Sequence, residues 1–266
     1  MKRIFALVLA IAMLACACLG FTSCGETKGD LQSVKDAGQI VIGITDYEPM
    51  DFEDSNGKWI GFDADLANEF AERLGVNCKF VEIEWKNKVA EINAKNIDLI
   101  WNGMTASDEL GTQIDFSIAY AKNAQVVVVK KGTSITKDSL SSLSIAVEQG
   151  SAGADVADNI IKPVSVNKVK KQLDALNEVV AGTSDAAVID LTMAQSKLGK
   201  GIYADLQVVS GAQYSDEVFA VGLRQGSDLK AELDKFLAEK YTDGTLARLS
   251  EKYDNAIVIN ESAFNK

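Results

Sequence analysis

The sequence predicts an α/β protein made of two Rossmann-like lobes with mixed sheets, joined by two hinge crossings of the chain. From residue 40 onward, short β-rich runs alternate with helical patterns, which favours mostly parallel strands covered by helices. The alternation restarts after residue 129, and a late apolar run at 219–223 can lead the chain back into the first unit. With 266 residues, the chain is long enough for two units of roughly 100–150 residues each.

In the first unit, apolar runs predict strands at 40–44, 79–83 and 97–101 and a short helix at 89–94. The clearest helix covers 64–74, because Leu66 and Phe70 share one apolar face and Gly75 follows as a stop. Asp63 precedes this face and is predicted to cap the helix, with Phe62 packing against its first turn.

The second unit repeats the pattern. Strands are predicted at 125–129, 143–147, 164–166 and 186–189, and helices after Gly153 and over 168–181. Two closing helices, separated at Asp243-Gly244, carry apolar residues at helical spacing. Hinge segments are expected near 125–129 and 218–223. The predicted division is a signal peptide at 1–23, a lipid-anchored tether at 24–37, lobe one at 38–127 and 219–266, and lobe two at 128–218.

The N-terminus has the three parts of a secretory signal: the basic Lys2 and Arg3, an apolar run, and a small-residue exit. A single membrane-spanning helix is the alternative, but the run is short for the roughly 20 apolar residues that this needs. The exit at Ser23-Cys24-Gly25 resembles a bacterial lipobox, with Cys16 and Cys18 as rival sites. Acylation of Cys24, with palmitate as a typical chain, would anchor the protein to the cell membrane on its outer side.

Composition excludes several kinds of chemistry. The chain has no histidine, so neither a Ser-His-Asp triad nor a His-ligated metal site is possible. A net charge of −11 argues against nucleic-acid binding, which needs clustered basic residues. No catalytic residue, metal or cofactor is therefore expected. Once the N-terminal cysteines are removed or acylated, Cys78 is the remaining thiol, and we expect it to be a small buried hydrophobe.

An ordered set of motifs resembles the type II periplasmic-binding-protein superfamily, and within it the solute-binding lipoproteins of polar-amino-acid ABC importers. The resemblance covers about residues 38–254, and its order and spacing are more specific than any single motif. The motifs are YEPMDF at 47–52, NGKWIGFDADLA at 56–67, IDLIWNGMT at 97–105, DFS at 115–117 with Tyr120, QGSAG at 149–153, DAAVID at 185–190 and DGTL at 243–246.

In the first lobe, the predicted ligand-binding residues follow strands, where open α/β sheets place their ligands. Tyr47 and Trp85 each follow a strand, and the resemblance implies that these two rings sandwich the ligand, although either could be a core residue. Asn102 ends a third strand, Gly103 lets the backbone approach a ligand, and Thr105 offers a hydroxyl.

In the second lobe, the segment containing Ser151 and Ala152 opens a helix whose free amides suit a carboxylate, unless Ser151 only caps that helix. Asp190 closes a buried strand and needs a cationic partner, which the resemblance identifies as the α-ammonium of the ligand. Its alternative role is to cap the next helix.

One position departs from the family pattern. Leu110 stands where the family commonly has an arginine that clamps the α-carboxylate of the ligand, and no arginine lies between residues 74 and 223. Lys88 or Lys122 could replace it, the helix amides and Thr105 could hold the carboxylate, or the ligand could lack one.

The resemblance implies a membrane-tethered, monomeric receptor that closes two lobes over a small polar solute, such as an amino acid or a derivative of one. Its expected partners are that solute and the permease and ATPase of an ABC importer. The alternative is a dehydratase-like enzyme on the same fold, for which Asp190 and Glu148 are the available acids.

Overall fold

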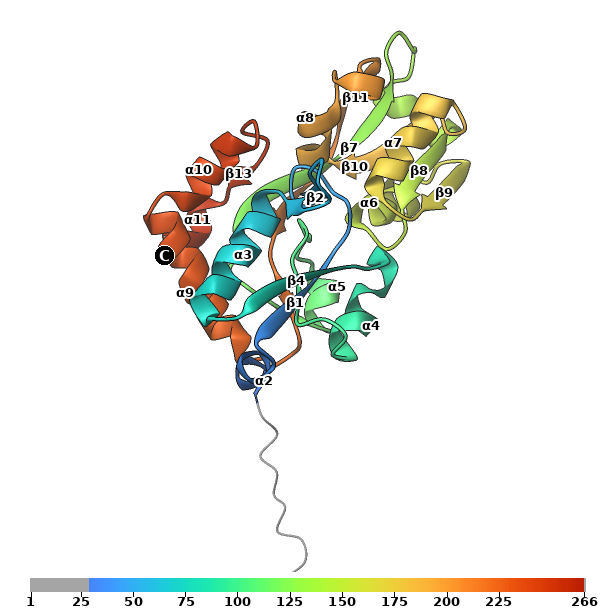
Figure 1. Ribbon diagram of the computed structural model, residues 1–266. Helices are drawn as coiled ribbons and strands as arrows, with labels where there is room; N and C mark the ends of the chain where they lie inside the picture. The colour runs from blue at the N-terminus through green and yellow to red at the C-terminus, as the bar shows by residue number, and fades with distance from the viewer. Residues whose placement is uncertain (1–28, 266) are drawn as a thin grey trace, which may run out of the picture.

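The computed structural model describes residues 29–265 and shows two α/β lobes, each built on its own sheet (Figure 1). The sheet of the first lobe has the strand order β4-β1-β5-β12-β6 and contains both parallel and antiparallel pairs. Its strands are β1 (Gln39–Ile44), β4 (Asn77–Glu82), β5 (Leu99–Ile100), β6 (Asp115–Phe116) and β12 (Gly222–Leu223). Mixed sheets in two lobes confirm the predicted fold class.

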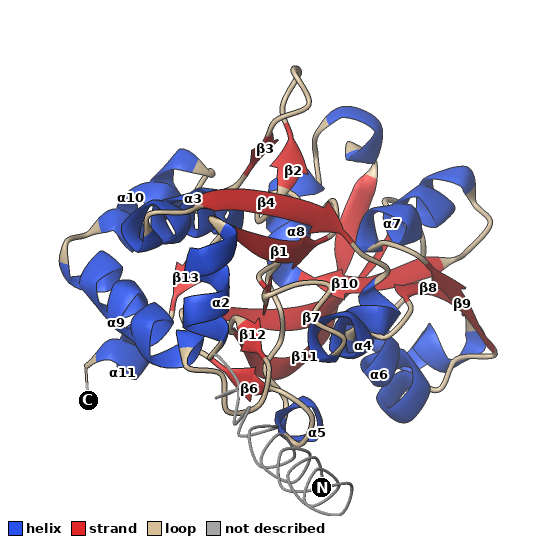
Figure 2. Ribbon diagram, turned by 60° about the horizontal axis from the view of Figure 1, so that its bottom comes forward, coloured by secondary structure: helices blue, strands red, loops and turns tan. Residues whose placement is uncertain are grey.

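The helices of the first lobe come from both ends of the chain and from residues 88–111 between them (Figure 2). They are α2 (Asp30–Ala37), α3 (Phe62–Leu74), α4 (Lys88–Asn93), α5 (Asp108–Gly111), α9 (Leu229–Thr242), α10 (Thr245–Lys252) and α11 (Glu261–Phe264). A hairpin of β2 (Phe52–Glu53) and β3 (Trp59–Ile60) precedes α3, and a 3-10 turn, η1 (Trp85–Asn87), precedes α4.

The second sheet has the order β11-β7-β10-β8-β9, and β13 (Val258–Ile259) pairs with the start of β7. Its strands are β7 (Ala121–Lys130), β8 (Ser144–Glu148), β9 (Ser165–Val169), β10 (Ala186–Asp190) and β11 (Leu206–Phe219). Its helices include α6 (Ala152–Asp155), which continues as the π-helix η3 (Val156–Ile161), α7 (Gln172–Ala181) and α8 (Leu191–Lys197). The 3-10 turns η2 (Lys137–Ser142) and η4 (Gly201–Tyr203) complete the lobe.

Two element boundaries differ from the sequence prediction. The helix expected from residue 168 begins at Gln172, because Lys168 and Val169 pair in parallel with Val147 and Glu148 at the edge of the sheet. The predicted lobe boundary at 127/128 falls inside β7, whose whole length pairs with β10 or β11 in the second sheet. In both cases pairing with a distant strand extends a strand beyond its local apolar signal.

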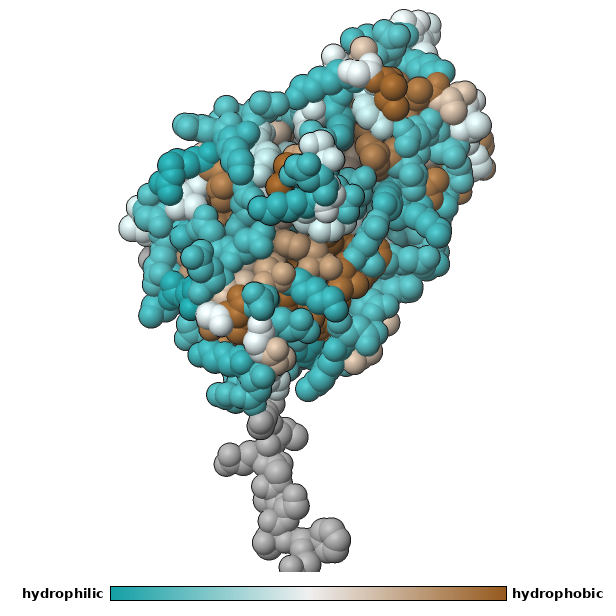
Figure 3. All heavy atoms as spheres, in the orientation of Figure 1, coloured by the Kyte–Doolittle hydropathy of each residue, from teal (hydrophilic) through white to brown (hydrophobic). Residues whose placement is uncertain are grey.

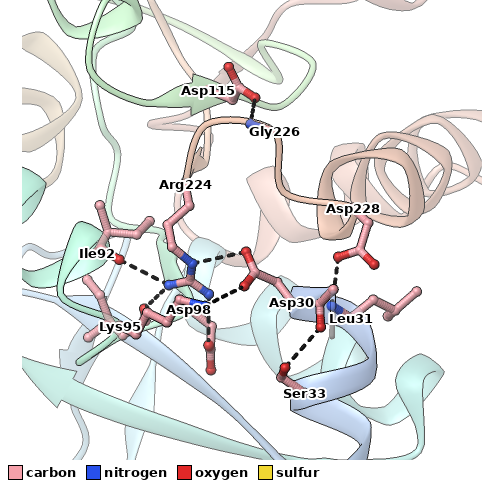
Figure 4. Close-up of polar contacts among 12 residues, drawn as sticks. Asp30, Leu31, Ser33, Ile92, Lys95, Asp98, Asp115, Arg224, Gly226 and Asp228 are labelled. Carbon is pink, nitrogen blue, oxygen red and sulfur yellow. Dashed lines mark hydrogen bonds and ion pairs between the residues drawn. The ribbon is translucent and has the colours of Figure 1, made fainter. Parts of the chain in front are cut away.

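The start of the described chain is fastened to the first lobe rather than free of it. Arg224 is 8% exposed, and its guanidinium donates to the Asp30 carboxylate at 3.0 Å and to the Asp98 carboxylate at 3.3 Å (Figure 4). The amide of Leu31 donates to Asp228 at 2.8 Å. Residues 30–37 therefore form helix α2 of the fold, and the tether predicted over 24–37 does not include them. The predicted signal peptide and Cys24 lie outside the described residues.

Asp63 has a different role from the predicted one. Helix α3 begins at Phe62 with Gly61 at its N-cap and no side-chain cap, so neither Asp63 nor Phe62 acts as expected. Asp63 is fully buried, and its Oδ2 accepts hydrogen bonds from the Gly103 amide at 2.6 Å and the Tyr120 hydroxyl at 2.7 Å. Burial raises the pKa of this carboxyl to about 7. Asp63 thus ties helix α3 to the loop that follows β5.

The surface visible in Figure 3 is largely hydrophilic, with apolar residues gathered in a band across the first lobe and in patches on the second. The largest apolar cluster includes residues of both lobes, and Phe70, Trp101 and Phe236 form mutual ring contacts in it beside the first sheet. Each lobe has a second, smaller cluster of its own. Within residues 29–265, no helix combines the length and apolar character needed to cross a membrane.

We predict that Asp63→Ala lowers the free energy of unfolding by about 2–4 kcal/mol, because it leaves two buried donors without an acceptor. Tyr120→Phe is the matched control, since it removes one of these two hydrogen bonds and keeps the ring. Urea unfolding of the protein lacking residues 1–23 measures both. Equal losses for the two variants would contradict the role assigned to the Gly103 amide.

Candidate functional site

A cavity of about 210 Å³ lies between the two lobes, at the carboxyl ends of their parallel strands. All eight residues that the sequence assigned to ligand binding line this cavity. Its volume is below the roughly 300–1,000 Å³ of pockets that take drug-sized molecules, so it suits a small solute. The first lobe contributes Tyr47, Trp85, Asn102, Gly103 and Thr105, and the second contributes Ser151, Ala152 and Asp190.

Two aromatic rings form part of the first-lobe wall. Tyr47 follows β1, is 3% exposed and packs edge-on against Phe219 with ring centroids 6.5 Å apart. Trp85 opens η1 after β4, and the ammonium of Lys88 lies 4.8 Å from its ring centroid. The Tyr47 hydroxyl is buried and lies beside the Asp190 carboxyl, whose pKa it lowers. Both rings line the cavity while also packing against protein, so the core and ligand roles are compatible.

The loop after β5 brings backbone close to the cavity. Gly103 has a φ of 53°, and a Cβ there would stand 2.8 Å from the Tyr47 ring, so a larger residue would not fit. The side chain of Asn102 is fully engaged within the protein: it donates to Asp51 at 2.7 Å and accepts from the Thr45 hydroxyl at 2.7 Å. Asn102 therefore holds the loop in shape, and Gly103 provides the open approach.

Asp190 ends β10 and lies at the base of the cavity. It stands at the N-cap position of α8 but makes no capping hydrogen bond, so the capping role is not used. Its carboxylate instead accepts from the side-chain amides of Asn123 and Gln125, each at 2.6 Å, and of Gln172 at 2.5 Å. Burial and the charge of Glu217 raise its pKa to about 6, while the hydrogen bonds from Gln172, Gln125 and the Tyr47 hydroxyl act in the opposite direction.

Sequence reasoning missed the residues that support Asp190. Glu217 on β11 accepts from Asn123 at 3.1 Å, from Gln125 at 2.9 Å and from Thr105 at 3.0 Å, so the two carboxylates share a set of neutral donors. The available signal was two amide side chains, Asn123 and Gln125, in the otherwise apolar run at 123–129. Polar residues at such buried positions need partners, which only the pairing of β7 with β10 and β11 identifies.

At the start of α6, Ser151 is a helix cap. Its hydroxyl accepts from the Ala154 amide at 3.1 Å and donates to the Glu148 carbonyl at 2.8 Å. What this segment presents to the cavity is therefore its backbone beside Ala152. The preceding Gly150 lies so close to the first lobe that a Cβ would meet the Lys86 Cα at 2.9 Å, which places the two lobes in direct contact here.

Of the two lysines considered as substitutes for a clamping arginine, the structure places Lys88 in the cavity wall and Lys122 outside it. Leu110 lines the cavity, and no arginine is among the described residues that do. Lys88 also lines it, is 5% exposed and donates to the Gly150 carbonyl at 2.7 Å across the cleft. Lys122 is exposed on β7 and is not part of the wall. Burial lowers the pKa of Lys88, opposed by the charges of Glu148 and Asp155.

Ion pairs join the lobes outside the cavity, and in each the lysine belongs to the second lobe and the carboxylate to the first. Isolated surface pairs contribute little to stability, but four with the same polarity favour one relative position of the lobes. The pairs are Lys171–Glu82, Lys170–Glu84, Lys197–Glu48 and Lys200–Asp254.

Comparisons with known proteins give the chain a family. Residues 40–256 match the family of bacterial extracellular solute-binding proteins, family 3. The L-cystine-binding protein of Escherichia coli is 30% identical over 236 residues, which cover 87% of this chain and 88% of that protein.

Two solved structures have the same architecture. One is an ABC uptake transporter substrate binding protein from Streptococcus pneumoniae with bound histidine, with a TM-score of 0.80, 30% identity, and 88% and 99% of the two chains covered. The other is an ancestral amino acid-binding protein described as a precursor of cyclohexadienyl dehydratase, with a TM-score of 0.77, 29% identity, and 84% and 98% covered. The chain therefore belongs to family 3 of the bacterial extracellular solute-binding proteins and has the type II periplasmic-binding-protein fold.

Proposed function

We propose that this protein captures a small polar amino acid, or a derivative of one, between its lobes and delivers it to an ABC importer. The observation that carries the proposal is the Asp190 carboxylate, which is 4% exposed at the cavity and is held by neutral amides. In the described chain no lysine or arginine forms an ion pair with it. A buried carboxylate without a cation suits the ammonium of an incoming solute.

The other walls suit the rest of such a solute. The rings of Tyr47 and Trp85 offer apolar and cation-attracting faces. A carboxylate, if the solute has one, would meet the Lys88 ammonium or the backbone beside Ala152, since Leu110 has no charge to offer. The relatives named above bind cystine and histidine, which supports an amino acid as the class of solute.

Delivery requires that the two lobes separate and close around the solute. Binding shifts such an equilibrium only if the solute contacts both lobes in the closed form. The cavity meets this condition, because the rings lie on the first lobe and Asp190 on the second. A permease that recognises the closed form would then receive the loaded protein, which we expect to act as a monomer.

A dehydratase-like enzyme is the second candidate, favoured by the buried acid Glu148, whose pKa burial raises to about 8. Such an acid is protonated at neutral pH and can donate a proton. Against this, the cavity wall of the described chain offers Lys88 as its cation and no arginine to hold a substrate carboxylate. Formation of a new product from a bound solute by the purified protein would favour the enzyme over the receptor.

The receptor is also proposed to be exported and tethered to the outer side of the cell membrane through lipid on Cys24. The basic start, the apolar run and the Ser23-Cys24-Gly25 exit support this proposal. Helix α2 is fastened to the first lobe near the end that residue 29 approaches, so a tether would lead from that lobe.

Asp190→Asn is expected to weaken binding of the cognate solute by about 2–5 kcal/mol, because the ammonium stays buried without a counter-charge. In the wild type, affinity should fall as the pH is lowered through about 6, where the Asp190 carboxyl becomes protonated. The variant should lose this pH dependence. Calorimetry between about pH 5 and pH 8 tests both expectations. An unchanged affinity would remove Asp190 from the site.

Leu110→Arg is expected to strengthen binding of ordinary α-amino acids such as glutamine or histidine, because a guanidinium pairs with a carboxylate in two parallel hydrogen bonds. The wild type should bind these amino acids weakly or not at all. Leu110→Met, which has similar volume and no charge, is the control. Submicromolar binding by the wild type, roughly 8 kcal/mol or more, would show that Lys88 or the helix amides already act as the clamp.

Mass spectrometry of the N-terminus from native membranes tests the anchor. We expect the chain to begin at Cys24 and to carry acyl groups, since the small-residue exit ends there. Cys24→Ser should release the protein from the membrane fraction. A retained segment 1–23, or acylation at Cys16 or Cys18 instead, would contradict the assignment.

A further inference from the structure

Glu148 is a buried acid that the proposed contacts leave unused. It is the last residue of β8, lies beside the strand that Asp190 ends, and lines the cavity with 3% of its surface exposed. Its backbone carbonyl is fixed by the hydroxyl and amide of Ser151, at 2.8 and 3.2 Å. Its side-chain Oε1 is buried and has no hydrogen-bond partner in the described chain.

The contrast with Asp190 is informative. Asp190 receives three amide hydrogen bonds, whereas Oε1 of Glu148 receives none. A buried polar atom without a partner costs free energy that a protein normally avoids, so it marks a place where a partner is missing. Because the side chain lines the cavity, the partner can come from a solute.

The charges around the cavity indicate what kind of partner this is. Four acidic side chains line it, and the cation that lines it with them is Lys88. The Lys88 ammonium already donates to the Gly150 carbonyl at 2.7 Å and lies over the Trp85 ring. A solute with a single ammonium could balance Asp190 but would leave Oε1 of Glu148 without a partner. A second basic nitrogen would supply that partner and would favour the charged form of Glu148. The acidic residues are Glu109, Glu148, Asp155 and Asp190.

We propose that Glu148 determines specificity by binding a second basic nitrogen of the solute, an amine or guanidine, while Asp190 holds the first. The inference rests on the proposed solute-binding function and narrows its substrate class to solutes with two basic nitrogens. The Tyr47 hydroxyl lies in the same cavity beside Asp190 and can accept a hydrogen bond from such a group.

Pairs of probes that differ by one group test the proposal on the wild type alone. Norleucine lacks only the terminal amine of lysine, and citrulline is a neutral counterpart of arginine. Calorimetry should show that the basic member of at least one pair binds about 30-fold or more tightly than its neutral partner, as expected for loss of one partner of a buried charge pair. Equal affinities, or preference for the neutral members, would overturn the proposal.

The variant Glu148→Gln tests whether Glu148 causes the preference for basic over neutral solutes. Glutamine keeps the size of the side chain and removes its charge, so the basic-over-neutral ratio should fall to about threefold or less. Glu251→Gln, at an exposed position on α10 of the first lobe, removes the same charge far from the cavity and should keep the wild-type ratio. An unchanged ratio in Glu148→Gln would exclude Glu148 as the determinant.

These experiments also distinguish failure of the role proposed for Glu148 from failure of the proposed solute-binding function. Cadaverine, which is lysine without its carboxylate, shows whether two nitrogens suffice for binding. If neutral amino acids bind and basic ones gain nothing, the receptor function stands and the role of Glu148 fails. If neither basic nor neutral probes bind, both fail. Because Oε1 of Glu148 receives no hydrogen bond without a solute, Glu148→Gln should fold with an unchanged or raised Tm, which a thermal scan verifies.

Discussion

The rest of the site depends on two buried carboxylates, Asp63 and Asp51, which fix the loop after β5 in the first-lobe wall. Asp63 accepts the Gly103 amide, and Asp51 accepts the amide of Asn102, so the loop after β5 is held from both sides. Burial raises the pKa of both acids, and the charge of Asp63 adds to the rise at Asp51. Acids kept this far from water are costly, and here they hold in place a glycine that cannot be replaced without a clash against Tyr47.

Buried acids also lie on the other side of the cleft. The second lobe presents Asp190 and Glu148 from the ends of two adjacent strands, and the raised pKa of each reflects burial together with a neighbouring negative charge. Outside the cavity the polarity is reversed, because second-lobe lysines pair with first-lobe carboxylates. Under the proposed function, the ion pairs of the rim would favour closure of the lobes, and the acidic interior would oppose it until a basic solute enters. Closure would then be coupled to occupancy of the cavity.

Leu110 shows how one substitution changes what such a cavity can hold. Leucine lacks the guanidinium that forms two parallel hydrogen bonds with a carboxylate. The ammonium of Lys88 in the wall is a point charge, and it already donates to the Gly150 carbonyl and lies over the Trp85 ring. Under the proposals above, such a cavity suits amines better than carboxylates. The described residues that support Asp190 are neutral amides, so they orient the acid without cancelling its charge.

The sequence by itself determined the α/β class and the division into two lobes, because apolar periodicity is a local signal. The resemblance of its ordered motifs to a known superfamily implied the residues that line the cavity. The sequence could not determine that Asp63 supports a loop rather than a helix cap, since its partners Gly103 and Tyr120 are 40 and 57 positions away. The sequence also could not show that Gln125 and Glu217 lie around Asp190, or that Oε1 of Glu148 has no hydrogen-bond partner in the described chain. Hydrogen-bond satisfaction inside a fold depends on which distant strands pair and in what register, and only the tertiary structure decides that.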